Sequence, residues 1–200
     1  MENFICKIDK IGFKGERKYL HGTDIFTTLL EGNDSFQKIN MQFHKSCRNK
    51  LIAKSVSVSE FNEMREKGEI CVLFTCILLN KKLLIVLLET EEEVIDRTPY
   101  DESRITSGSV IKGSIITQNK PVEGNFIERV VALNKSLLTH YTGENNWFFS
   151  KIDLAKFPSS YNNLSLEVVR ELGGRIYQSI LKSDNNKLGT VYFSKDSLWV

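Results

Sequence analysis

A histidine–glycine pair stands directly before a short segment with the periodicity of a helix. His21 and Gly22 precede apolar residues at helical spacing, namely Ile25, Phe26, Leu29 and Leu30. An imidazole at such a position can serve as a general base or as a hydrogen-bond donor, and the positive end of a helix can polarise a carbonyl group. His21 is therefore a candidate catalytic residue, and the alternative is a surface histidine at the entry to a helix.

A carboxylate and an amide are two further candidates. Asp24 suits the start of the same helix, where its oxygens accept hydrogen bonds from first-turn amides; alternatively, its carboxylate orients a water molecule for catalysis. Asn134 falls on the apolar stripe of a second predicted helix, and a buried amide must find partners. It either contacts a substrate or braces the core, and bracing is the more usual role of a buried polar side chain.

The remaining histidines and nucleophiles form no catalytic motif. His44 lies on the polar side of a predicted strand, and His140 ends a helix, where a cation suits the dipole. No serine stands in a Gly-x-Ser-x-Gly elbow, and no glycine-rich phosphate loop is present. Because His44 and Cys47 are spaced like two metal ligands without a second pair, we expect no metal site and no cofactor.

The composition is that of a globular protein. With 200 residues, 41% of them hydrophobic, the chain suffices for one compact domain or for two small ones that share a core. The formal net charge is +2, and basic residues are interleaved with acidic ones along most of the sequence. A nucleic-acid binder usually concentrates its basic residues, so we expect no nucleic-acid partner.

The amino-terminal residues and the cysteines bear on location. The start has no charged leader followed by a long apolar stretch, so no signal peptide is expected. The longest apolar run, 70–79, is too short to span a bilayer as a helix. It contains Cys71 and Cys76, which are typical of small buried hydrophobes, and the four cysteines include no Cys-x-x-Cys pair. We expect a cytoplasmic protein without a membrane segment, because a reducing compartment fits these cysteines.

Periodicity divides the first half into strands and two short helices. A helix begins near Thr23 and ends at 32–34, and a second, polar helix covers 59–67. The expected strands are 4–11, 39–44, 51–58, 70–79 and 83–88, the last two as a hairpin joined at 80–82. The acidic stretch 89–93 is expected to be a solvated strand end, and 97–108 the connection to the second half.

The second half repeats this order around a longer helix. One strand is predicted over 110–117, followed by a turn at 121–124 and a helix from about 125 to 141. Further strands are expected at 147–154, 164–172, 175–181 and 188–193. Gly173-Gly174 predicts a two-residue hairpin turn, and 183–186 predicts a second turn.

A strand, a glycine-led helix and three or four antiparallel strands, occurring twice, resemble the hot-dog fold, in which a curved antiparallel sheet wraps a helix. The resemblance covers nearly the whole chain and is clearest over 121–194, in the helix, the strand ending near Phe157-Pro158 and the run 164–170 before the Gly-Gly hairpin. It implies an α+β fold class with two tandem hot-dog units, residues 1–98 and 99–200. The first copy departs through the inserted segment 59–67.

The resemblance also implies a chemistry. Hot-dog proteins are mostly thioesterases and hydroxyacyl dehydratases that act on coenzyme A or acyl-carrier-protein thioesters, and some relatives are acyltransferases. The His21-Gly22 pair is similar to the one that opens the central helix of many hot-dog thioesterases. Gly124 and Glu128 resemble the dehydratase pattern, in which a helix glutamate pairs with a histidine of the other unit, although the spacing here is shorter by one residue. A solvated helix acid is the alternative for Glu128.

These observations combine into one hypothesis with two rivals. The resemblance implies an acyl-thioester dehydratase or thioesterase, with His21, Glu128 and Asp24 as catalytic residues. Gly22, Gly124 and Asn134 would bind the substrate, an acyl-carrier-protein or coenzyme A thioester, and a homodimer is left open. The rivals are a non-catalytic module that binds acyl groups and an acyltransferase.

Overall fold

The chain divides into two compact units, Met1–Tyr100 and Asp101–Leu198. The computed structural model describes residues 5–8, 10–30, 35–120 and 123–195. The predicted helix end at 32–34 and the first two residues of the predicted turn at 121–124 lie outside these ranges. Within them, no helix is both long enough and apolar enough to cross a membrane.

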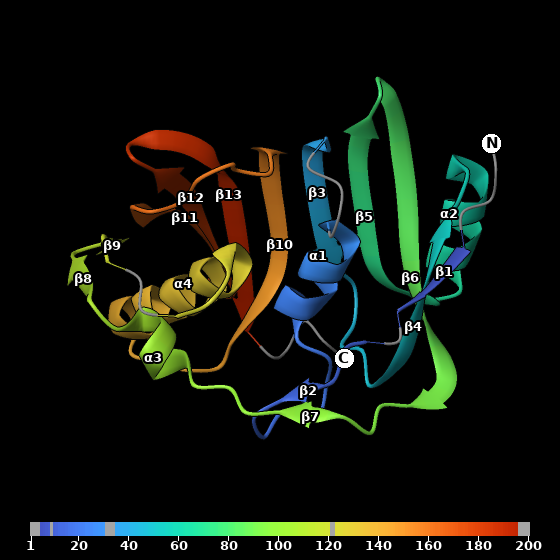
Figure 1. Ribbon diagram of the computed structural model, residues 1–200, viewed down its shortest axis with the longest axis horizontal. Coiled ribbons are helices and arrows are strands. Elements are labelled where there is room, and N and C mark those ends of the chain that lie inside the picture. Colours follow the sequence, from blue (N-terminus) through green and yellow to red (C-terminus); the bar gives the residue numbers. More distant parts are fainter. Residues whose placement is uncertain (1–4, 9, 31–34, 121–122, 196–200) are drawn as a thin grey trace. The chain divides into compact units, whose positions relative to one another are not determined.

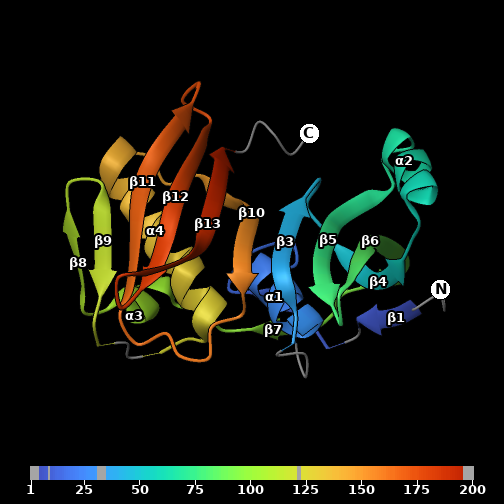
Figure 2. The same ribbon diagram turned by 90° about the horizontal axis from the view of Figure 1, so that it is seen from above.

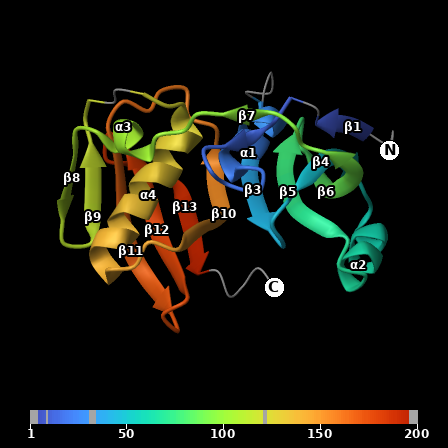
Figure 3. The ribbon, with the colours of Figure 1, turned by 90° about the horizontal axis from the view of Figure 1, so that it is seen from below.

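The first unit is a five-stranded antiparallel sheet with a helix on one face. Its elements in chain order are β1 (Ile5–Ile8), β2 (Phe13–Lys14), α1 (Gly22–Leu30), β3 (Gln37–Phe43), β4 (Asn49–Ser55), α2 (Val58–Glu66), β5 (Ile70–Leu78), β6 (Lys81–Glu93) and β7 (Arg97–Thr98). The strand order is β1-β4-β6-β5-β3. Short β2 and β7 form a separate parallel pair. Helix α1 lies across one face of β3, in front of it in Figure 3 and behind it in Figure 2.

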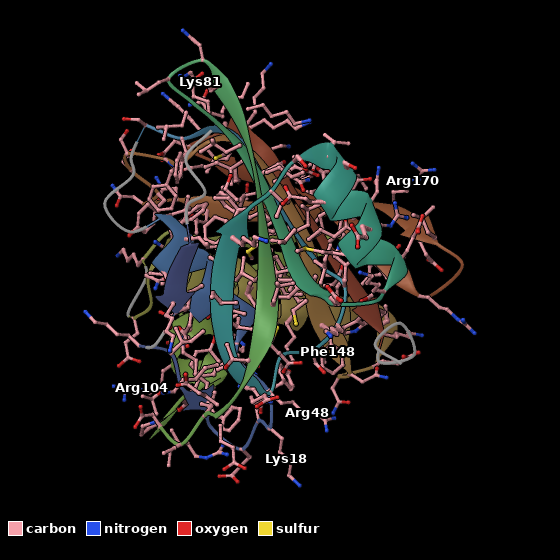
Figure 4. All side chains as sticks on the ribbon, turned by 90° about the vertical axis from the view of Figure 1, so that its right-hand side faces the viewer. Lys18, Arg48, Lys81, Arg104, Phe148 and Arg170 are labelled. Carbon is pink, nitrogen blue, oxygen red and sulfur yellow. The ribbon has the colours of Figure 1, made fainter. Side chains whose placement is uncertain are left out.

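The predicted hairpin of two apolar strands is confirmed. Strands β5 and β6 pair from Ile70 to Leu78 and turn at Leu79 and Asn80, which have φ values of 50° and 62°. Two successive positive φ values match the right-handed twist of the flanking strands. Lys81, the first residue of β6, lies at the tip of this hairpin (Figure 4).

Helix α2 is the inserted segment of the first copy, and it forms a core of its own. Ser57 caps it, since its hydroxyl accepts from the Glu60 amide while the Glu60 carboxylate accepts from the Ser57 amide. Phe61 and Met64 of this helix pack against a buried cluster on the sheet. That cluster consists of Val56, Ile70 and Val86.

The second unit is a six-stranded antiparallel sheet with a long helix on one face. Its elements are α3 (Glu102–Thr106), β8 (Ser109–Lys112), β9 (Ile115–Gln118), α4 (Phe126–Thr142), β10 (Trp147–Lys156), β11 (Leu164–Leu172), β12 (Ile176–Ser183) and β13 (Asn186–Lys195). The strand order is β8-β9-β11-β12-β13-β10. Figure 2 views this sheet with α4 behind the strands, and Figure 3 views it with α4 in front.

Two tight turns fix the register of the second sheet, as predicted. Gly173 and Gly174 join β11 to β12 with φ values of 59° and 66°, and Asp184 and Asn185 join β12 to β13 with φ values of 48° and 65°. The single strand predicted over 110–117 is wrong, because the chain reverses at Gly113 (φ 58°) and forms the hairpin β8–β9. The connection predicted over 97–108 contains two elements, β7 and α3.

The two units share a plan but differ in the order of two strands. In each sheet, one strand that precedes the helix in the chain (β1 or β9) and the strand directly after the helix (β3 or β10) flank three further strands. Those three run β4-β6-β5 in the first unit and β11-β12-β13 in the second. A two-residue turn forces β11 and β12 to be neighbours. In the first unit, α2 connects β4 to β5, and β5 does not pair with β4; β6 lies between them in the sheet. The predicted α+β fold class, an antiparallel sheet around a helix in each half, is confirmed.

Candidate functional site

His21 is buried at the amino-terminal end of α1. Only 6% of its surface is exposed, which differs from the surface position that was the alternative. The backbone fixes it from both sides, because the Leu20 amide donates to the Cys47 carbonyl at 2.7 Å. On the helix side, the His21 carbonyl accepts from the amides of Asp24 and Ile25 at 3.0 and 3.3 Å. Backbone hydrogen bonds on both sides therefore fix the position of His21 relative to α1.

The imidazole ring has two defined neighbours. Its Nδ1 lies 2.6 Å from the hydroxyl of Thr23, which is fully buried. The ring of Tyr100 lies at a centroid distance of 5.0 Å and an interplanar angle of 51°. A hydroxyl partner and an aromatic neighbour together restrict both the tilt and the rotation of the imidazole.

A buried lysine completes this cluster and determines the environment of Asp24. The Lys14 ammonium lies 2.6 Å from the Asp24 carboxylate and donates to the Thr23 hydroxyl at 3.3 Å. It also lies 4.9 Å from the centre of the Tyr100 ring, a cation–π distance. The ion pair balances the Asp24 charge. Asp24 was expected to cap the helix, but it is the third residue of α1, inside the first turn, where its negative charge suits the helix dipole.

The parallel pair β2–β7 brings Tyr100 to the histidine. The Phe13 amide donates to the Asp96 carbonyl at 2.8 Å, and the Gly15 amide donates to the Thr98 carbonyl at 2.9 Å. Figure 1 shows β7 lying alongside β2, so the residues that lead to the second unit first run back along the first. Tyr100 lies two residues after β7, and the guanidinium of Arg17 lies over its ring, 5.0 Å from the ring centre.

Sequence reasoning found the helix entry of this cluster but missed the residues around it. His21, Gly22 and Asp24 are brought together because they are consecutive or nearly so. Lys14 and Tyr100 carry no local signal, since they reach the histidine through pairing between segments more than eighty residues apart. The residues next to Lys14 in the sequence do not indicate that it is buried, so its burial becomes evident only from its contacts in the folded chain.

Gly124 and Glu128 lie together at the start of α4. The Glu128 carboxylate accepts from the Asn125 amide at 2.9 Å, and the Asn125 side chain accepts from the Glu128 amide at 3.0 Å, a capping box. Gly124 has a φ of 88°, and a side chain there would approach Ile105 at 3.3 Å. His21 belongs to the first unit and Glu128 to the second, and their partnership stays a prediction.

Asn134 is fully buried in the middle of α4. Among the described residues, neither its amide nitrogen nor its carbonyl oxygen has a hydrogen-bond partner. A bracing role would supply such partners, so this observation favours a ligand or a water molecule as the partner. The other polar residue buried on this helix, Arg129, is fully engaged with Gln118, Tyr161 and Asn162.

A groove of about 450 Å³ lies on the second unit beside α4. Its lining comes from α3, β8 and α4 and includes Glu102, Ile111, Lys135 and His140. Two of these lining residues form an ion pair, with the Lys135 ammonium 2.9 Å from the Glu102 carboxylate. The groove is open to solvent at the exposed His140, and its lining does not include Gly124, Glu128 or Asn134, the predicted site residues of the second unit.

Comparisons with known proteins give similarity in fold only. No family model matches the chain, and no curated protein sequence matches it. A 12:0-ACP thioesterase from Umbellularia californica is 10% identical with a TM-score of 0.47, and the match covers 96% of each chain. The dehydratase domain of MlnD from Bacillus amyloliquefaciens is 8% identical with a TM-score of 0.45, covering 96% of this chain and 92% of that one.

A third solved structure is a protein of unknown function with a hot-dog fold from Alicyclobacillus acidocaldarius. It is 8% identical with a TM-score of 0.46, and the match covers 96% of this chain and 91% of that one. Over nearly its whole length, the chain resembles proteins of the hot-dog fold.

Proposed function

We propose that the chain acts on acyl thioesters carried by coenzyme A or by an acyl-carrier protein, with His21 as the group that polarises the thioester carbonyl. The observation that carries this proposal is the buried imidazole at the start of α1, held by Thr23 and Tyr100. The substrate class follows from the resemblance of the His21-Gly22 pair to hot-dog thioesterases.

The contacts of Thr23 favour one tautomer of His21. The Thr23 hydroxyl accepts a hydrogen bond from the Lys14 ammonium, which leaves its own hydrogen to donate to the Nδ1 of His21. The ring proton then resides on Nε2, the nitrogen directed away from Thr23. A neutral imidazole with Nε2–H can donate to a carbonyl oxygen.

The helix supplies the second part of the chemistry. The amino-terminal end of α1 carries the positive end of the helix dipole, which stabilises negative charge that develops on a carbonyl oxygen. Gly22, the first residue of α1, has no side chain to keep an acyl group from this end. In the proposed reactions, Glu128 of α4 serves as the acid–base partner, and the outcome is hydrolysis of the thioester or loss of water from a hydroxyacyl group.

A specific observation favours a second candidate, a module that binds acyl groups without turnover. The Asp24 carboxylate is paired with Lys14 at 2.6 Å, and the Glu128 carboxylate accepts from the Asn125 amide at 2.9 Å. A general base must exchange protons freely, whereas the Asp24 carboxylate is held in an ion pair and the Glu128 carboxylate belongs to a capping box. Under this candidate, the acyl pocket is retained and the chemistry is lost.

The test is incubation of the full chain with a panel of acyl-coenzyme A and acyl-carrier-protein thioesters. Release of free thiol marks a thioesterase, loss of one water from a hydroxyacyl substrate marks a dehydratase, and tight binding without turnover marks the binding module. For an enzyme, His21→Ala should lower kcat by roughly 100-fold or more, because it removes the polarising donor.

Two variants separate chemistry from folding. Thr23→Val keeps the shape of the side chain and removes the Nδ1 partner, so it should lower kcat by roughly 10-fold. It also leaves buried polar groups without their hydroxyl partner and should lower the free energy of unfolding by about 1–3 kcal/mol, so kcat is measured at a temperature at which the variant is folded. His140→Ala, a change at an exposed histidine, should leave turnover unchanged. Full activity in His21→Ala would remove His21 from the mechanism.

A further inference from the structure

The β5–β6 hairpin of the first unit ends in an exposed leucine. Leu79 occupies the first position of the turn, with a φ of 50° and 83% of its surface exposed. Leucine is disfavoured in this left-handed conformation, because its Cβ atom crowds the following carbonyl oxygen. The Leu79 side chain therefore contributes neither to the core nor to the stability of the turn.

Two other tight turns of the chain show which residues this geometry ordinarily uses. Gly173 and Gly174 join β11 to β12, and each has a positive φ. Asp184 and Asn185 join β12 to β13, again with two positive φ values. Glycine, aspartate and asparagine adopt these values more readily than other residues. Turn geometry therefore does not account for a leucine at position 79.

Two exposed lysines follow the turn. Lys81 pairs with Leu78 across the hairpin, and Lys82 is exposed like its neighbour. Lys82 in turn pairs with Ile77, so each lysine lies opposite an apolar residue of β5. The segment 70–88 contains no acidic residue. Within the part of the chain that the structure describes, neither lysine has an ion-pair partner, whereas lysines elsewhere in the unit do.

The tip of the hairpin extends beyond the strands on either side of it. Pairing with β3 stops at Ile77, which lies opposite Gln37. On the other side, pairing ends with the Val56 amide, which donates to the Leu84 carbonyl at 3.0 Å. Figure 1 shows the hairpin reaching past the end of β3, and Figure 4 shows Lys81 at the end of the unit. The tip is therefore a narrow projection with an apolar apex and two positive charges.

We propose that this tip binds the surface of a bilayer that contains anionic lipids, with Leu79 in the head-group region and Lys81 and Lys82 at the lipid phosphates. An apolar side chain gains by leaving water at the boundary between head groups and acyl chains, and an anionic surface attracts nearby lysines. The flexible lysine stems keep the ammonium groups at head-group level while the apex enters. This contact needs no membrane-spanning segment and does not depend on the acyl-thioester function.

The small size of the tip favours a lipid surface over a protein partner. A specific protein interface buries roughly 800 Å² on each partner and needs a matching surface. A two-residue turn and the side chains beside it supply only a fraction of that area. Lipids, in contrast, move aside for a convex projection of any shape, so a single apolar apex is sufficient for a weak contact.

The charge of the tip determines the class of lipid. Lys38 is exposed at the start of β3 and lies at the same end of the sheet, because the neighbouring Gln37 pairs with Ile77. Together with Lys81 and Lys82, it adds a third positive charge to this end. A zwitterionic surface offers these lysines no net attraction, whereas an anionic surface strengthens binding with each lysine that comes near it.

The experiment sediments the full chain with vesicles of phosphatidylcholine, either alone or with roughly 30% phosphatidylglycerol. We expect binding to the anionic vesicles only, and we expect most of it to be lost at about 1 M salt, because salt screens the lysine charges. Leu79→Gly should weaken binding by roughly 10-fold, since the apex loses its apolar side chain. Lys81→Gln combined with Lys82→Gln should weaken it by roughly 10-fold as well.

Two controls separate the tip from folding and from general charge. Glycine accepts a φ of 50°, so Leu79→Gly should leave the thermal midpoint unchanged or raise it. Figure 4 shows Lys18 and Arg48, both exposed, at the opposite end of the same unit from Lys81. Lys18→Gln combined with Arg48→Gln removes the same charge as the double variant of the tip and should keep binding within about twofold.

Three results would overturn the proposal. If the wild type does not bind anionic vesicles, the tip is left as a contact for an acidic protein. If the Lys18 and Arg48 variant loses as much binding as the Lys81 and Lys82 variant, the attraction belongs to the charge of the whole surface. If the wild type self-associates without vesicles and Leu79→Gly abolishes this, the apex contacts a second copy of the chain.

Discussion

Asn134 places an amide in the interior of the second unit without a partner among the described residues. Leaving a buried amide unsatisfied costs about 1–3 kcal/mol of stability. Such a residue is retained when it serves function at the expense of stability. We expect Asn134→Leu to raise the free energy of unfolding by about 1 kcal/mol, because the substitution nearly preserves volume and removes the unsatisfied group.

The same variant should lose affinity for any acyl ligand whose polar group meets this amide. Denaturant titration gives the stability, and calorimetry with the thioester panel gives the affinity. Asn125→Ala is the contrasting change, since Asn125 caps α4 and its loss should lower stability by about 1 kcal/mol. A destabilised Asn134→Leu would mean that the amide is satisfied by an ordered water.

His44 gives the first unit a dependence on pH. Burial lowers its pKa from the ordinary value of 6.5, and the nearby Arg65 of α2 lowers it further. The unfolded chain takes up this proton first as pH falls, so stability is complete above pH 6.5 and declines below it, until the pH reaches the lowered pKa of the folded state.

The measurement is the urea midpoint at about pH 7.5 and about pH 5.5, compared between the wild type and His44→Gln. The midpoint of the wild type should fall further than that of the variant. His140→Gln, which changes an exposed histidine, should follow the wild type. Equal declines in the wild type and in His44→Gln would remove His44 as the cause.

At the scale of elements, Gly189 lets β13 approach β10 closely. A Cβ atom at this position would lie 1.9 Å from the Asp153 carbonyl oxygen, an atom of the backbone that cannot move without disturbing the strand pairing. We expect Gly189→Ala to lower the free energy of unfolding by about 3 kcal/mol, as overpacking of a rigid contact does.

Gly113→Asn is the matched control for this change. Gly113 has a φ of 58° but no atom within 4 Å of the position of a Cβ, and asparagine tolerates this conformation. It should change stability by less than about 1 kcal/mol in the same denaturant titration. A mild Gly189→Ala variant would indicate that β10 and β13 separate locally at little cost.

The elements that sequence reasoning predicted are those with local signals. Gly173-Gly174 and 183–186 predicted tight turns that the structure contains, because glycine, aspartate and asparagine adopt positive φ more readily than other residues. The reversal at Gly113 was missed because apolar residues on both sides of it look like one strand. Helix α3 was missed because its five residues are too few to establish a period.

At the scale of the whole molecule, the twofold repetition of a helix on an antiparallel sheet followed from the order of elements, but the difference in strand order did not. Nothing local to β5 or β6 states which of them will lie beside β4; that depends on the path that α2 permits. The site divides in the same way, since the helix entry at His21 could be recognised from neighbouring residues, whereas Lys14 and Tyr100 arrive through tertiary pairing.

The position of Tyr100 also bears on the order of events during protein synthesis. A nascent chain that has left the ribosome as far as Glu93 contains every strand of the first sheet, so that sheet can already form. The aromatic neighbour of His21 follows only with β7 and the residue pair after it. Translation therefore delivers the scaffold first, and the imidazole acquires its final surroundings only as the ribosome begins the second unit.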